Sequence, residues 1–342
     1  LRAVHGHVYL FHQNSVFSAR SFFQVGGVQP ARDNNYGFQV GSPLWKGANL
    51  SVDGSQTRSR GNVNGNVLVP TPEERTPLTR DPVTRPLVQR MLDLYPRALP
   101  NRTDISPRML NTNAPQSIDN DIGGIGLDQA IGSRDRLVGR YRHTAQRVDA
   151  FQLVTGQNPD TRTKAHDSRL TWTRVLSATT ALEATTAFDR VQSELVPARG
   201  AFPVTVLTSD VIQGLGPGSN IPITRSVNQF RNGFQVRQSR GRHNWTFGAE
   251  ILRRQVNGFE ADTHRGQFSF RGDYGRDAIT NILMGTPSSF IQSIGNVHRG
   301  FRNWDSQFYI GDRWQAAQNL TLNLGLRYEP ISSPYEVNGL NE

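Results

Sequence analysis

The stretch from Leu320 to Glu329 constrains the fold of this chain more than any other segment, because its apolar residues alternate with polar residues or glycine. A period of two puts successive side chains on opposite faces of a β-strand, whereas one face of an α-helix repeats every 3.6 residues. One face of the strand therefore collects Leu320, Leu322, Leu324, Leu326 and Tyr328. The length of ten residues matches the roughly 9–11 residues of a tilted transmembrane strand. A half-buried strand of a soluble protein has the same pattern, so the segment predicts a strand and leaves its surroundings open.

The same period recurs along the chain. Apolar residues alternate with polar ones in five further segments, at 36–40, 48–52, 137–141, 182–188 and 245–251. A series of such segments predicts an all-β chain.

The connections between these segments alternate between two lengths. Short turns are expected near 42–45, 132–135, 175–178, 239–242 and 316–319, and long connections at about 13–33, 59–122, 148–163, 193–228 and 258–302. Outer-membrane barrels have short periplasmic turns and long extracellular loops. Long structureless connections also argue against a compact soluble domain. The sequence therefore predicts an antiparallel transmembrane β-barrel.

The longest connection, 59–122, is rich in proline. Proline cannot donate a backbone hydrogen bond, so we expect an irregular extracellular loop along much of this segment. Short helices are expected at 87–94 within it, entered after Pro86 and ended before Pro96, and at 277–283 within the last connection.

The strand count indicates a partial barrel. One strand at about 4–12 and two around each short turn give eleven spanning strands, whereas single-chain bacterial barrels normally close with an even number. Leu1-Arg2-Ala3-Val4 is no signal peptide, and the last residues are polar and loop-like. We therefore expect residues 1–342 to be one part of a barrel domain.

Tryptophan placement agrees with this interpretation. Trp45, Trp172, Trp245 and Trp314 lie in or near a short turn, where an interfacial aromatic girdle is expected. Trp304 then marks the opposite interface. Tryptophan also closes turns in soluble proteins, which is the competing explanation.

If the apolar faces meet lipid, the opposite faces line a polar lumen. The side chains expected there are those of Arg136, Arg140, Arg142, Arg169, Glu183, Asp189, Glu250, Asn323, Arg327 and Glu329. They either hydrate the wall, which is the simpler role, or contribute to ligand binding.

Composition limits the chemistry. The chain has no cysteine, which excludes disulfides, thiolate metal sites and thiol nucleophiles. The formal net charge of +10 comes almost wholly from arginine and is dispersed. It permits contact with phosphate, lipopolysaccharide or nucleic acid, but no stacking motif or recognition helix supports a nucleic-acid partner.

No catalytic, cofactor or metal motif is expected. The chain contains neither a nucleophile-elbow motif nor the glycine spacing of nucleotide-binding loops. His5 and His7 share a strand face and suit a metal only with a third ligand such as His12. Lumen lining is the simpler role for these histidines.

Several segments resemble Oar-like TonB-dependent transporters. They are residues 5–9, 19–23, 34–38, 81–96, 137–141, 241–250 and 283–289, and most specifically Phe308-Tyr309-Ile310-Gly311-Asp312-Arg313-Trp314 with the strand 320–329. Arg313 departs from the pattern, because a second acidic residue is common there. The resemblance implies a 22-stranded outer-membrane barrel closed by a plug, on which TonB and its inner-membrane partners pull to admit ligand. This chain would supply the first half of that barrel, without the plug.

Two membrane functions follow. The first is uptake of a large ligand, such as a peptide, an oligosaccharide or a metal chelate, with lipid and lipopolysaccharide around the barrel. The second is a passive porin-like channel or an adhesion scaffold. A soluble arginine-rich nucleic-acid binder is the third class, and its affinity would fall steeply with salt.

We expect the full-length protein to fractionate with the outer membrane and to shift its mobility on heating in detergent gels, because closed barrels resist detergent until they are heated. Recovery of the protein in the soluble fraction contradicts the barrel.

Overall fold

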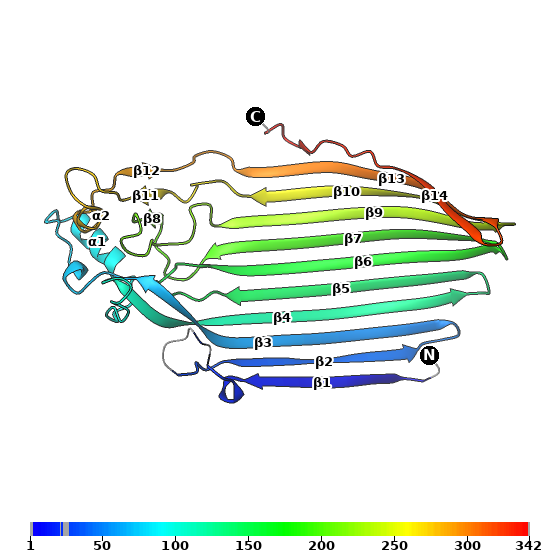
Figure 1. The fold of residues 1–342 in the computed structure, drawn as a ribbon, viewed down its shortest axis with the longest axis horizontal. Coiled ribbons are helices and arrows are strands. Elements are labelled where there is room, and N and C mark those ends of the chain that lie inside the picture. Colours follow the sequence, from blue (N-terminus) through cyan, green and yellow to red (C-terminus); the bar gives the residue numbers. More distant parts are fainter. Residues whose placement is uncertain (1–2, 21, 23–26, 341–342) are drawn as a thin grey trace.

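Eleven long strands form one continuous antiparallel sheet in a computed structural model, which describes residues 3–20, 22 and 27–340. The strands pair in sequence order (Figure 1). They are β1 (His5–Asn14), β2 (Arg32–Pro43), β3 (Ala48–Leu68), β4 (Met109–Ile131), β5 (Asp135–Asp149), β6 (Pro159–Ser177), β7 (Thr180–Pro197), β9 (Ile223–Arg240), β10 (His243–Phe259), β13 (His298–Ala317) and β14 (Leu320–Tyr328). A short β15 (Tyr335–Glu336) adds to β13. The predicted antiparallel fold and its eleven spanning strands are confirmed.

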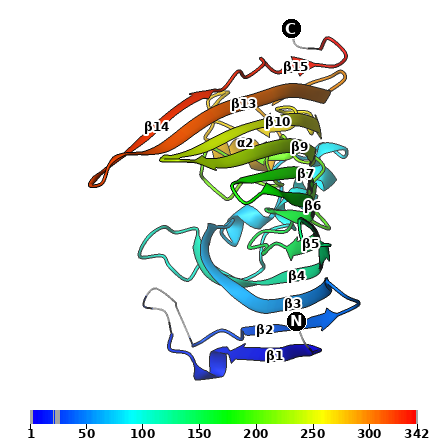
Figure 2. The same cartoon turned by 90° about the vertical axis from the view of Figure 1, so that its right-hand side faces the viewer.

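The sheet is open. Its path ends at β1 and at β14, which do not pair with each other among the described residues. Seen along the strands, the sheet is curved like a piece of a barrel wall (Figure 2). The predicted partial barrel is therefore confirmed.

The two ends of the sheet differ, as the sequence predicts. Short turns join the strands at one end, while the long connections and both helices gather at the other (Figure 1). Glycine makes two of these turns possible: Gly132 and Gly241 have φ of +65° and +60°, in the left-handed region that other residues rarely adopt.

The strands are longer than predicted and the connections correspondingly shorter. The structure places only residues 69–108 of the expected loop 59–122 outside the strands, because β3 continues to Leu68 and β4 begins at Met109. Residues 53–66 of β3 are mostly polar or glycine on both faces, so the apolar alternation ends while the backbone ladder continues. Pro115 fits within β4 because it lies beyond Ser117, the last β4 residue that pairs with β5.

The long connections contain a second, smaller set of elements. Both predicted helices are present, as α1 (Thr84–Leu92) and α2 (Ala278–Met284). The expected entry of the first helix after Pro86 is wrong, because α1 begins at Thr84 and holds Pro86 in its first turn, where a missing N–H costs no helical hydrogen bond. A three-stranded sheet joins β8 (Thr205–Leu207), β11 (Gln267–Ser269) and β12 (Ser289–Ile291), and two 3-10 turns lie at Ser15–Phe17 and Glu73–Arg75. We call the four connections 69–108, 150–158, 198–222 and 260–297 the loop cap.

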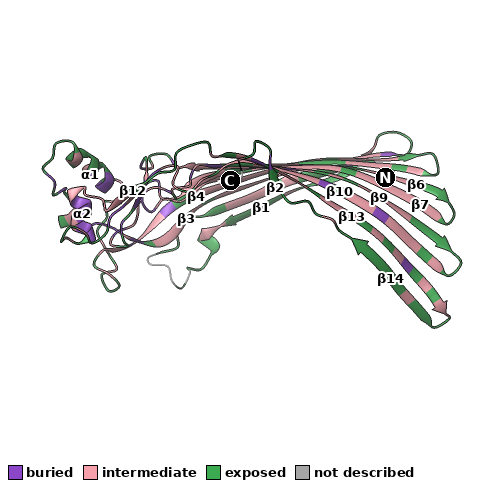
Figure 3. Ribbon diagram, turned by 90° about the horizontal axis from the view of Figure 1, so that it is seen from above, coloured by how far each residue is buried: buried purple, intermediate pink, exposed green. Residues whose placement is uncertain are grey.

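The loop cap has its own hydrophobic core. Buried residues concentrate at this end of the molecule, whereas the strands are mostly half-buried or exposed (Figure 3). The core takes side chains from all four connections and from the adjoining ends of β3 and β4, among them Val67, Val88, Tyr95, Val154, Ile212, Phe270 and Ile282. A shared core makes the four connections one packed body.

Helix α2 is fixed at both ends. The Asp277 carboxylate accepts a hydrogen bond of 2.9 Å from the Thr280 backbone N–H, which caps the first turn. Gly285 ends the helix with φ of +66°. A Cβ on Gly285 would lie 2.4 Å from Thr84 Cγ2 and 2.9 Å from Val88 Cγ2, so this glycine also lets α2 approach α1.

Gly285→Ala is therefore expected to loosen the packing of α1 against α2. Gly275→Ala is the matched control, because Gly275 has φ of +68° but open space around its Cβ position. The control should pay only the backbone cost of about 1–2 kcal/mol, and Gly285→Ala should cost more. Hydrogen exchange of the α1 and α2 amides measures both, and equal exchange in the two variants contradicts the close approach.

Candidate functional site

One face of the sheet is apolar from β1 to β14. Residues directly opposite each other in a ladder share a face, so the strand registers fix its membership. This apolar face carries Val8, Leu10, Phe38, Val40, Leu50, Val52, Ile125, Leu127, Leu137, Tyr141, Leu170, Leu182, Phe188, Phe230, Phe234, Val236, Phe247, Ile251, Phe308, Ile310, Leu322, Leu324 and Leu326. Phe234 and Leu324 are 54% and 55% exposed. An exposed apolar surface that runs across a whole sheet is suited to contact with lipid rather than water.

The tryptophans lie where the sequence places them. Trp172, Trp245 and Trp314 are on the apolar face towards its short-turn end, and Trp45 lies in the turn between β2 and β3. The indole N–H of Trp45 donates to Gln129 at 2.6 Å, and that of Trp172 donates to Asp135 at 2.9 Å. Each of these two rings thus combines an apolar body with a satisfied polar edge, as an interfacial residue requires.

Trp304 lies on the same face, towards the other end of β13. The guanidinium carbon of Arg253 lies 5.1 Å from the centre of its ring, which is within cation–π range. The five tryptophans are consistent with two interfacial girdles, and that role remains a prediction.

Beyond the apolar band, the same face becomes ionic towards the long connections. Arg60 pairs with Asp119 at 2.6 Å, and Arg147 pairs with Asp149 at 2.9 Å. Charged pairs at this level fit water or lipid headgroups and do not fit hydrocarbon. These ion pairs mark the edge of the apolar band that lies towards the loop cap.

The opposite face, which we call the polar face, collects the ten residues expected in the lumen. Nine lie in the strands with side chains on this face, and the tenth, Glu329, directly follows β14. They are Arg136, Arg140, Arg142, Arg169, Glu183, Asp189, Glu250, Asn323, Arg327 and Glu329. That the polar face lines a lumen remains a prediction.

Some of these ten residues are brought together and others are not. The Nε of Arg136 donates to Asp128 at 2.9 Å, and Arg327 donates to Gln307 and Glu329. Arg140 lies directly opposite Arg169, and Asp189 directly opposite Asp167. Glu183 and Asn323 have uncharged or cationic cross-strand neighbours and make no ion pair among the described residues.

Three charged residues of the polar face were missed by the sequence analysis. Arg254 pairs with Asp305, and Arg231 Nε lies 3.4 Å from Glu250 Oε1. With Glu329 they line a recess of about 260 Å³ on the polar face. The sequence pattern could have identified these three residues, because each occupies a polar position next to the alternating apolar residues of β9, β10 and β13.

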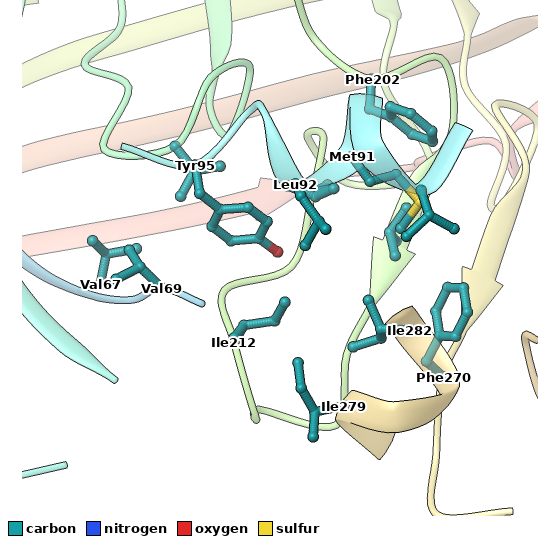
Figure 4. Close-up of a cluster of buried hydrophobic side chains, with 14 of the residues drawn as sticks. Val67, Val69, Met91, Leu92, Tyr95, Phe202, Ile212, Phe270, Ile279 and Ile282 are labelled. Atoms are coloured by element: carbon teal, nitrogen blue, oxygen red, sulfur yellow. The ribbon is translucent and has the colours of Figure 1, made fainter. Parts of the chain in front are cut away.

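The loop cap holds polar groups in fixed positions next to its core. The phenol of Tyr95 is buried in this core near Leu92 and Ile212 (Figure 4) and donates to the backbone oxygen of Gln213. Burial raises the pKa of Tyr95. The phenol is therefore a neutral donor that ties α1 to the connection 198–222.

Glu74 and Arg108 join the two ends of the first connection. Arg108 Nε donates to Glu74 Oε2 at 2.9 Å, and the same carboxylate accepts from the Thr71 backbone at 3.0 Å. Burial raises the pKa of Glu74, but these hydrogen bonds outweigh burial and hold the pKa below its usual range. The pair stays ionised and fixes the loop where it leaves β3 and returns to β4.

A metal site on β1 finds no support. His5 and His7 point to the polar face, whereas His12 lies on the other face and contacts Asn34 at 2.7 Å. The third ligand considered from the sequence is therefore on the wrong side of the sheet. Across residues 3–20, 22 and 27–340, no three His, Asp or Glu side chains gather as a metal site would require.

None of the helices in this described part is long and apolar enough to cross a membrane.

A protein-family profile described as outer membrane beta barrel domain matches residues 2–342. No curated protein matches the sequence.

Three solved structures share the fold. The outer membrane transporter YddB from Escherichia coli is 13% identical with a TM-score of 0.59, and 98% of this chain covers 40% of that one. The ferric citrate transporter FecA in the unliganded form is 9% identical with a TM-score of 0.51, and the match covers 98% of this chain and 39% of that one. A mutant of the ferric enterobactin receptor PfeA from Pseudomonas aeruginosa is 10% identical with a TM-score of 0.52, and the match covers 96% of this chain and 40% of that one. The chain thus spans about two fifths of the length of each.

Phe234→Arg tests which face meets lipid. Phe234 lies between Ala184 and Ala249, which offer no counter-charge, whereas an arginine at Leu324 would face Asp312. The substitution should cost about 2–4 kcal/mol if Phe234 lies at mid-depth in the bilayer. Gln235→Arg, next to it on the polar face, should cost far less. Urea unfolding of the full-length protein in phospholipid vesicles measures the free energy of unfolding of each variant. An equal decrease in the two variants contradicts the assignment of the faces.

Proposed function

Because the chain belongs to the outer membrane beta barrel domain family, which places it in the bacterial outer membrane, we propose that it forms part of the wall of a receptor that takes up a large ligand. The observation that carries the proposal is the fold shared with the outer membrane transporter YddB over 98% of this chain. The three solved structures with this fold are named as transporters or as a receptor, not as enzymes.

In the orientation we propose, the short turns face the periplasm and the loop cap faces the outside. The apolar face then meets lipid, with lipopolysaccharide around its ionic upper edge, and the polar face lines the lumen. The tryptophans near the short turns form the periplasmic girdle, and Trp304 belongs to the outer one.

Ligand capture is assigned to the loop cap. Its shared core holds four connections in one arrangement, so the surface that meets a ligand is preorganised and loses little conformational freedom on binding. Below it, the recess with Arg231, Glu250, Arg254 and Asp305 offers a polar contact on the route through the lumen.

A metal chelate is the ligand class we place first, ahead of a peptide or an oligosaccharide. Two of the structures with the same fold are named for ferric citrate and ferric enterobactin. The net charge of +10 also favours an anionic ligand.

Energy for uptake would come from a plug and the TonB complex. The resemblance of the sequence to Oar-like transporters supports this part of the proposal. A passive or adhesive barrel is the alternative, and its transport would not depend on TonB.

The test is iron uptake in a host that lacks its own chelate receptors and expresses the full-length gene. We expect radioactive iron to enter with at least one ferric chelate only when TonB is intact. Arg231→Gln should lower uptake several-fold, whereas Arg253→Gln, on the apolar face, should not. Uptake that is equal without TonB indicates the passive barrel, and uptake of none of the chelates contradicts the proposed ligand class.

A further inference from the structure

A histidine, a carboxylate and two tryptophans form an unusual cluster on the apolar face at the short-turn end of β10 and β13. The imidazole of His243 is stacked between Trp245 and Trp314, with ring centres 5.6 and 5.5 Å away and planes tilted by 14° and 9°. Its Nδ1 lies 2.6 Å from Asp312 Oδ2. The proposed function gives the two tryptophans a place in the periplasmic girdle and gives His243 and Asp312 no role.

Asp312 is out of place on a surface that meets lipid. It lies directly opposite Leu324 in β14 and Trp245 in β10, and it is 7% exposed. Its second oxygen, Oδ1, is buried without a hydrogen-bond partner among the described residues. A buried carboxylate requires a hydrogen-bond donor, because removing an unpaired charge from water is unfavourable. His243 Nδ1 is the donor within reach.

The contact with Asp312 fixes the orientation of the imidazole. An ionised carboxylate accepts the Nδ1–H, so Nε2 is left on the other side of the ring, where no described residue bonds to it. Both indole rings stack with the imidazole and limit its rotation. The His243 side chain is 38% exposed, so its free edge remains accessible.

A guanidinium lies beside this edge. Arg240 is directly opposite His243 across the turn at Gly241, so both side chains share the apolar face. Arg240 is exposed and makes no ion pair or side-chain hydrogen bond with the described residues. A guanidinium and a free imidazole edge therefore lie side by side at the edge of the apolar band.

We propose that Arg240, His243, Trp245 and Trp314 bind the phosphate of a phospholipid headgroup in the periplasmic leaflet, with Asp312 as the positioning residue for His243. Phosphate oxygens accept charge-assisted hydrogen bonds from the Arg240 guanidinium and, when the imidazole carries both protons, from His243 Nε2–H. The acyl chains of the same lipid then lie along Phe247 and Leu322, on the same face. The proposal rests on the orientation given under Proposed function.

A lipid is favoured over free phosphate by the position of the site. The donors lie on the apolar face, next to side chains that need hydrocarbon, and not on the polar face where a soluble anion would pass. Glycolipid of the outer leaflet would lie at the opposite end of the strands, beyond Trp304.

Native mass spectrometry of the full-length protein, released from detergent after addition of phosphatidylglycerol, tests the proposal. We expect a retained lipid on the wild-type protein and a roughly tenfold loss of affinity in Arg240→Gln and in His243→Gln, since each removes one charge-assisted hydrogen bond. Arg240→Lys should retain most of the binding. Arg237→Gln is the matched control, because Arg237 lies on the polar face of the same strand.

Asp312→Asn separates positioning from folding. The amide has the shape of the carboxylate but no charge, so lipid retention should fall while the heat-modifiable gel mobility of the folded barrel is kept. Should His243→Gln or Asp312→Asn fail to fold, Arg240→Gln at the turn still decides, because Arg240 is exposed and makes no ion pair or side-chain hydrogen bond with the described residues.

Equal lipid retention in Arg240→Gln and Arg237→Gln overturns the proposal, as does complete displacement of the lipid by millimolar inorganic phosphate, which would indicate a free-anion site. Wild-type protein absent from the outer membrane would instead overturn the proposed function itself. Loss of retention confined to the Arg240, His243 and Asp312 variants supports the lipid site.

Discussion

Backbone hydrogen bonding is the constraint on which this structure depends. Within a bilayer no water can satisfy an exposed N–H or C=O, so a spanning strand must pair on both sides. The nine inner strands meet this demand by pairing in sequence order, each antiparallel to the next, whereas β1 and β14 each pair on one side among the described residues. The ladder in turn fixes the side chains, because the register that joins two backbones also sets which residues share a face. One ladder therefore produces both the apolar face and the polar face.

The loop cap follows the opposite physical rule. The strands expose apolar side chains and bury little, whereas the cap buries side chains such as Val154, Ile212 and Phe270 in a core of its own. In the proposed orientation that core lies in water, where burial of apolar surface is the main stabilising effect. The molecule then combines a wall that contacts lipid with a cap that contacts water. The boundary between them lies where outward apolar residues give way to pairs such as Arg60 with Asp119.

The sequence predicts the wall better than it predicts the cap. Period-two alternation is local, so strand order, turn positions and face membership follow from the residues themselves. For example, Leu326 and Arg327 are neighbours in β14 and point to opposite faces of the sheet. The ends of the strands are harder to predict from the sequence, because the ladder continues past the apolar band in β3 and β4. The core of the cap joins side chains far apart in the sequence, and no period links Tyr95 to Ile212. Partners such as Arg254 with Asp305 also depend on the register between strands, which alternation within one strand does not supply.

The central claim is that the apolar face meets lipid and the polar face meets water. The chain has no cysteine, so single cysteines placed at consecutive positions from Asn244 to Ile251 of β10 can each carry a spin label without background. Collision rates with oxygen, which concentrates in lipid, and with a water-soluble nickel complex then report the surroundings of each position. The account predicts that oxygen accessibility alternates with a period of two, with maxima at Trp245, Phe247, Ala249 and Ile251. Uniform accessibility along the strand, or maxima at Thr246 and Glu250, would contradict it.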